Sequence, residues 1–127
     1  MSVSYTDLNG CTTAAPTILP VTVNPLPIPA LTGPTPVCVN STGNVYSTTA
    51  GMPNYVWTVS AGGTITSGGG AGNNTVTVTW NTAGAQSVSV SYTDLNGCTT
   101  AAPTILPVTV NPLPIPALTG PTPVCVN

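Results

Sequence analysis

Four cysteines are the side chains of this sequence best suited to covalent chemistry. They are Cys11, Cys38, Cys98 and Cys125, and neither a C-x-x-C pair nor a histidine accompanies them. Zinc sites are usually built from closely spaced Cys and His ligands, so a disulfide is favoured over a metal site. We predict a bond between Cys38 and Cys98. It would close a loop of about 60 residues and contribute about 4 kcal/mol in the chain-entropy model.

The charged side chains limit the function further, because Asp7 and Asp94 are the only ones and the chain has no Lys, Arg or His. Acid–base and nucleophilic catalysis need a titratable group poised near neutral pH with a partner. We therefore predict that the chain is not an enzyme and takes no cofactor. Binding of nucleic acid and of anionic membrane surfaces depends on basic residues, so both partners are excluded, and no apolar run is long enough for membrane insertion.

The segment Asp94-Leu95-Asn96-Gly97 alternates oxygen-bearing side chains and therefore invites a calcium interpretation. Calcium takes six to eight oxygen ligands and usually several carboxylates, whereas this segment offers one. We predict instead a hairpin turn in which Asn96 and Gly97 both adopt positive φ, and we predict no metal site.

Three other motifs have a chemical and a structural interpretation. Residues 68–72 are rich in glycine, but a phosphate-binding loop of the Walker type needs a lysine, so a strand connection is favoured. Trp57 and Trp80 are candidate sugar-stacking platforms, yet both are in phase with apolar neighbours and are predicted to be core residues. The row of Thr75, Thr77 and Thr79 is a candidate polysaccharide surface, although such rows are ordinary on the solvated face of a sheet.

These residues must be positioned by strands, because alternation with a period of two dominates the sequence and no helical period is sustained. In the run from Thr75 to Trp80 one face is apolar and the other carries threonine. Short strands separated by turn residues predict an all-β, immunoglobulin-like antiparallel β-sandwich. The predicted strands are 36–39, 45–48, 55–59, 64–66, 75–80, 87–93 and 105–110, and the predicted core comprises Trp57, Val76, Val78, Trp80, Val88 and Val90.

Residues 2–40 recur without a change as residues 89–127, at an offset of 87 residues. Identical repeats of this length are typical of tandem arrays of small domains. Proline-rich text marks the junctions, so we predict the end of a preceding repeat in 1–26, a complete repeat in 27–113 and the beginning of a following repeat in 114–127. Met1 stands where the repeat has Val88, so we interpret the sequence as a window of a longer protein.

Several segments together resemble a known family: GPTPVC, YVWTVSAGG, TVTW, YTDLNGC and NPLP. They resemble the PKD-like, immunoglobulin-like repeats of very large Bacteroidetes surface proteins, among them gliding-type adhesins. The resemblance covers the whole repeat. It implies a β-sandwich, secretion to the cell surface and a role as a stalk or an adhesive array.

We therefore expect a structural repeat of a secreted surface adhesin or an extracellular filament, whose partners are further copies of itself and, as a second candidate, surface polysaccharide. Chains would associate head to tail or laterally, and an intermolecular bond between Cys11 and Cys125 would link them into a fibre. The even number of cysteines per repeat favours an oxidising location. The alternative is a carbohydrate-binding or spacer module of a secreted hydrolase, which an exposed Trp or Tyr patch would favour.

Overall fold

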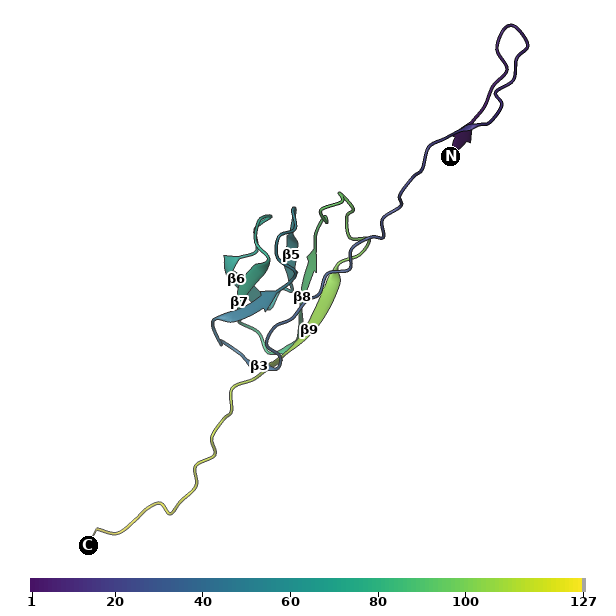
Figure 1. Cartoon of the computed structure of the whole chain (residues 1–127). Coiled ribbons are helices and arrows are strands. Elements are labelled where there is room, and N and C mark those ends of the chain that lie inside the picture. Colours follow the sequence, from purple (N-terminus) through teal and green to yellow (C-terminus); the bar gives the residue numbers. More distant parts are fainter. Residues whose placement is uncertain (127) are drawn as a thin grey trace.

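The computed structural model describes residues 1–126, and within them every regular element is a strand (Figure 1). The strands form three sheets: a two-stranded sheet β1-β2, a four-stranded sheet β3-β9-β8-β5 and a three-stranded sheet β4-β7-β6. The all-β prediction is thus confirmed. The bounds are β1 Ser2–Val3, β2 Thr17–Ile18, β3 Val37–Cys38, β4 Asn44–Ser47, β5 Val56–Val59, β6 Gly63–Gly68, β7 Thr75–Trp80, β8 Gly84–Ser91 and β9 Thr104–Asn111.

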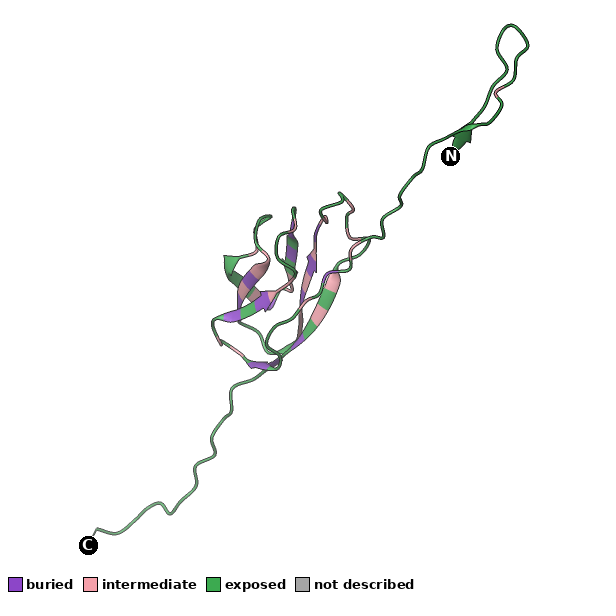
Figure 2. Ribbon diagram, viewed as in Figure 1, coloured by how far each residue is buried: buried purple, intermediate pink, exposed green. Residues whose placement is uncertain are grey.

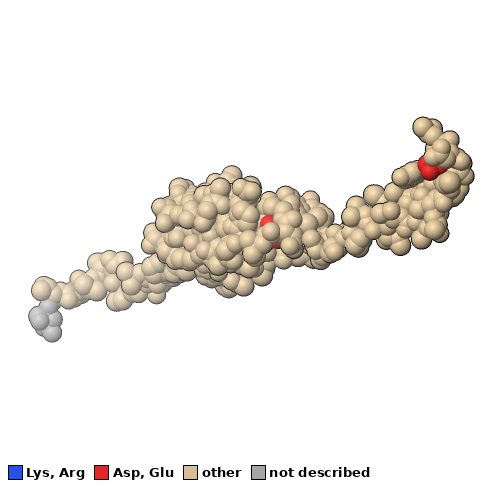
Figure 3. All heavy atoms as spheres, turned by 45° about the horizontal axis from the view of Figure 1, so that its top comes forward, with Lys and Arg blue, Asp and Glu red and all other residues tan. Residues whose placement is uncertain are grey.

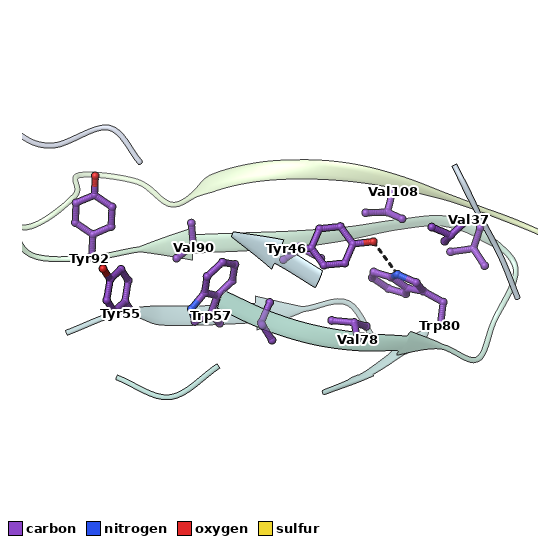
Figure 4. Close-up of a cluster of buried hydrophobic side chains, with 12 residues drawn as sticks. Val37, Tyr46, Tyr55, Trp57, Val78, Trp80, Val90, Tyr92 and Val108 are labelled. Atoms are coloured by element: carbon purple, nitrogen blue, oxygen red, sulfur yellow. Dashed lines mark hydrogen bonds between the residues drawn. The ribbon is translucent and has the colours of Figure 1, made fainter. Parts of the chain in front are cut away.

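The core lies between the four-stranded and the three-stranded sheet, and it is filled by the apolar faces of alternating strands (Figure 4). In β7 the residues Val76, Val78 and Trp80 are buried, while the threonines between them are partly exposed. Each buried β-branched or aromatic side chain removes apolar surface from water, which is the main stabilising contribution to a domain of this size. All six residues predicted for the core are buried: Trp57, Val76, Val78, Trp80, Val88 and Val90.

The segment that leads into β3 runs along the edge of the sandwich. Pro29 is fully buried there, Thr32 forms an isolated bridge with Ser47 of β4, and the Thr35 hydroxyl accepts a hydrogen bond from the Thr109 amide at 3.0 Å. Strand β3 then pairs with β9 in parallel, with Cys38 opposite Asn111. The predicted antiparallel sandwich is thus observed with a parallel pair at its edge, because the chain runs alongside β9 in the same direction before it turns into β4.

The two flanks of the sandwich leave it at opposite ends (Figure 1). Residues 1–26 carry the small β1-β2 hairpin and a proline-rich approach, and residues 112–126 continue beyond β9 without regular structure. Both flanks are almost entirely exposed (Figure 2). None of the elements in residues 1–126 is a helix long and apolar enough to span a bilayer.

Candidate functional site: the cysteines and the two ends of the sandwich

All four cysteines are free thiols: Cys38 and Cys98 lie at the two ends of the sandwich, whereas Cys11 and Cys125 lie in its flanks. Cys38 lies opposite Asn111 at the last residue of β9, whereas Cys98 precedes Thr104, the first residue of that strand. Because β9 has eight residues at about 3.3 Å each, its two ends are about 23 Å apart. A disulfide requires Cα atoms within about 7 Å. The predicted bond between Cys38 and Cys98 is therefore wrong: the sandwich separates the two thiols along its full length.

Cys98 closes a turn that is organised by a carboxylate. The Asp94 Oδ1 atom accepts hydrogen bonds from the amides of Asn96 and Cys98, both at 2.9 Å, and the Asp94 amide donates to the Cys98 carbonyl at 2.8 Å. Gly97 has a φ of 81°, whereas Asn96 is not in the left-handed region, so the prediction of positive φ holds for Gly97 alone. One of the two oxygens of this carboxylate, Oδ1, is thus engaged in backbone hydrogen bonds that organise the turn.

The described part of the chain contains no cluster of three or more His, Cys, Asp or Glu side chains that could hold a metal ion. Likewise, residues 1–126 enclose no pocket. The glycine-rich segment 68–72 is a strand connection between β6 and β7, and the Gly70 amide donates to Asn73 Oδ1 at 3.0 Å. The candidate sites are therefore the surfaces and the ends of the sandwich and not a concave pocket.

The two tryptophans are engaged inside the domain (Figure 4). Trp80 Nε1 donates to the Tyr46 hydroxyl at 3.0 Å, and that hydroxyl donates to the Pro34 carbonyl at 2.9 Å. Trp57 Nε1 donates to the Asn73 carbonyl at 2.8 Å. Both indole rings therefore have satisfied polar atoms and buried faces, so neither offers a platform on which a sugar could stack.

Tyr46 was not among the predicted core residues, although it connects three parts of the fold. Burial raises the pKa of its hydroxyl, and the hydrogen bond from Trp80 opposes that rise. Its ring meets that of Trp80 edge to face, with centroids 6.3 Å apart. Side chains alternate between the two faces of a strand, so Tyr46 lies on the face opposite to that of Val45 in the predicted strand 45–48. This alternation is the signal from which the burial of Tyr46 could have been predicted.

The outer face of the three-stranded sheet carries the predicted threonine row. Thr77 lies opposite Val45 of β4, Thr75 lies opposite Ser47, and Thr79 lies opposite Thr64 of β6. The row thus continues across strands as a mixed surface of hydroxyl and methyl groups. Asp7 and Asp94 are the only charged side chains of the sequence, and the face in Figure 3 is otherwise without charged side chains among the described residues.

Two of three comparisons with known proteins give a match. The family model of the PKD-like domain matches residues 24–108. Among solved structures, the chain is similar to the crystal structure of domains 4 and 5 of the S-layer protein SbsC, with 20% sequence identity and a TM-score of 0.42. That similarity covers 72% of this chain and 57% of the other. A comparison with curated proteins gives no match.

Proposed function

The chain belongs to the PKD-like domain family, and from that premise we propose that it is a structural repeat of an extracellular surface protein, built into the stalk of an adhesin or into a filament. The observation that carries the proposal is the path of the chain. It enters the sandwich at one end and leaves at the other, so repeats joined in series extend away from one another (Figure 1).

The connection between repeats supports a stiff array. Pro112, Pro114 and Pro116 follow one another at every second position after β9. Proline fixes φ and favours the extended polyproline geometry, which behaves as a semi-rigid spacer. From Asn111 to Pro116, the equivalent of the buried Pro29, such a connection spans about 16 Å at 3.1 Å per residue. With the length of β9 added, one repeat advances the array by about 40 Å.

The character of the surface supports the proposed self-association. Natural sheets commonly protect their edges with lysine or proline, whereas the edge strands β5 and β6 contain neither. A formal net charge of −2 provides almost no repulsion between copies. Lateral contacts through these edges would join arrays side by side, and a bond between Cys11 and Cys125, both exposed, would join chains end to end.

The burial of Trp57 and Trp80 weighs against the alternative of a carbohydrate-binding module. Such modules present exposed aromatic rings to sugars, and the two tryptophans of this chain are in the core. The threonine row on β7 would remain the candidate surface for polysaccharide, and it is secondary to association between copies.

Sedimentation velocity of the purified chain over a range of concentrations, with negative-stain microscopy of the same samples, tests self-association. We expect mass to rise with concentration and elongated particles to appear, little affected by salt because the surface is almost uncharged. A C11S/C125S variant should retain the lateral species and lose any ladder that reductant dissolves. A monodisperse monomer at every concentration, without elongated particles, would overturn the self-association and leave a passive stalk.

A further inference from the structure

The two thiols of one repeat lie where two repeats would meet. Cys38 is at the end of the sandwich from which the chain leaves, and Cys98 is at the end where it enters. Neither has a partner within its own repeat, and both are at least partly accessible. In an array, the exit end of one repeat faces the entry end of the next. The thiol at the Cys38 position of one repeat therefore faces the thiol at the Cys98 position of the next repeat at each junction.

The register of the entry segment fixes the position of the next repeat. Val37 pairs with Val110, so Pro29, eight residues earlier in a segment that runs alongside β9, lies near the start of that strand. The equivalent residue of the following repeat is Pro116. Since Asn111 and Pro116 are five residues apart, about 16 Å separates the exit end of one sandwich from the entry end of the next.

The turn that carries Cys98 reaches back across this gap. Beyond the last β8-β9 pair, Val90 with Thr104, the hairpin continues through the bridge between Thr93 and Thr99 to the Asp94–Cys98 hydrogen bond. Four residues separate Val90 from Asp94, which corresponds to a projection of about 13 Å. The projection spans much of the connection, so the thiol at the Cys98 position of one repeat lies on the side of the junction that faces the thiol at the Cys38 position of the repeat before it.

We propose that the disulfides of this protein link consecutive repeats, joining the thiol at the Cys38 position of one repeat to the thiol at the Cys98 position of the repeat that follows. The inference rests on the proposed array and assigns the cysteines a role in it: each bond would fasten a proline connection that otherwise depends on backbone stiffness alone. The Cys11–Cys125 pair would be the same contact made between two chains, because these residues repeat the Cys98 and Cys38 positions.

Formation of each bond is a two-electron oxidation. The two thiols lose their protons, a bond forms between their Sγ atoms, and the electrons pass to a disulfide oxidant such as glutathione disulfide, whose sulfur–sulfur bond breaks to give two thiols. Secreted proteins meet oxidants of this class in the oxidising compartments through which they pass or into which they are released.

The test lengthens the 127-residue chain by one further 87-residue period, so that two complete repeats follow each other. One variant keeps Cys38 and the second repeat's equivalent of Cys98, with serine at all other cysteines. The matched control is the 127-residue chain with C11S and C125S, which keeps Cys38 and Cys98. Both are equilibrated in glutathione redox buffer, and the free thiols of the monomer are counted by maleimide labelling and mass spectrometry.

We expect the junction pair to lose both thiols at a glutathione disulfide concentration at least tenfold lower than the control requires. In denaturant the order should reverse, because the control then closes the shorter loop. A folded junction variant that keeps two free thiols, or a folded control that forms the bond within one repeat, would overturn the inference. Small-angle scattering of the fully reduced two-repeat chain separates the two proposals: an extended but unbridged chain contradicts the disulfide alone, and a folded-back chain contradicts the array.

Discussion

Residues 2–24 and 89–111 have the same sequence and different structures. In both copies an aspartate accepts two amide hydrogen bonds at the turn, Asp7 in the first and Asp94 in the second. The strands differ: β9 has eight residues, whereas the equivalent β2 has two. Val110 is 2% exposed and its counterpart Val23 is 87% exposed.

The difference separates local from tertiary causes of structure. The turn forms in both copies because its hydrogen bonds are made within a few residues of sequence. The long strand forms only in the second copy, where residues 41–88 supply the first five residues of β8 and the facing sheet. An isolated two-stranded hairpin is marginal in water, so the first copy needs the body of its own repeat to extend its strands.

The largest effect on the free energy of unfolding is expected at a repeated position that is buried in the second copy and exposed in the first. Val110→Asp places a carboxylate in the core and should lower the free energy of unfolding by about 4 kcal/mol or more, which removes much of a small domain's stability. Val23→Asp, in the identical sequence, should change it by less than about 0.5 kcal/mol. Urea denaturation followed by tryptophan fluorescence measures both. Equal effects of the two substitutions would show that the first copy also packs into a core.

The next effect concerns a close approach of backbone to a ring. A Cβ atom on Gly33 would overlap with the ring of Tyr46, whereas one on Gly120, in the repeated copy, meets nothing within 4 Å. Gly33→Ala should therefore cost about 1 to 3 kcal/mol, the usual penalty of overpacking, and Gly120→Ala should cost close to nothing. Thermal unfolding of the two variants distinguishes them, and a stable Gly33→Ala would contradict the packing of the entry segment against β4.

Tyr46 belongs to the part of the repeat that occurs once, and it offers a pH-dependent test. Tyr46→Phe leaves Trp80 Nε1 without its acceptor, which should cost about 1 to 3 kcal/mol. Because burial raises the pKa of Tyr46, the unfolded chain loses its proton at lower pH than the folded chain. The contribution of Tyr46 to stability is thus complete below about pH 10 and declines as the pH rises above it.

Tyr46→Phe should lack the part of the loss of stability at alkaline pH that comes from Tyr46. Tyr5→Phe, at an exposed position, should retain it. Denaturation curves at pH 8 and pH 11 provide the measurement. An identical alkaline loss in Tyr46→Phe and the unsubstituted chain would show that the buried hydroxyl is not responsible.

The smallest effect is expected at the turn that both copies form. Asp94→Ala removes two amide hydrogen bonds and should destabilise the sandwich by about 1 kcal/mol. Asp7→Ala should leave sandwich stability unchanged, while the amide resonances of residues 5–13 lose their hairpin pattern in NMR spectra. A loss of stability in Asp7→Ala equal to that in Asp94→Ala would mean that the two hairpins are energetically coupled.

Local alternation was sufficient to predict most of the fold. The strand 75–80 was predicted with its observed bounds, because its apolar and hydroxyl residues alternate strictly and turns flank it. The parallel pairing of β3 with β9 could not be read from the sequence, since it depends on the direction from which the entry segment arrives. The same long-range geometry explains the mistaken Cys38–Cys98 bond: an even cysteine count indicates pairing but does not identify the partners.

The most direct measurement is the length of chains that contain one, two and three complete repeats, determined by small-angle scattering under reducing conditions. A stiff array that enters each sandwich at one end and leaves at the other should gain about 40 Å in maximum dimension with every 87-residue period. An increment well below that value, with a radius of gyration that barely rises, would show that successive repeats fold back on one another and would contradict the structural role proposed for them.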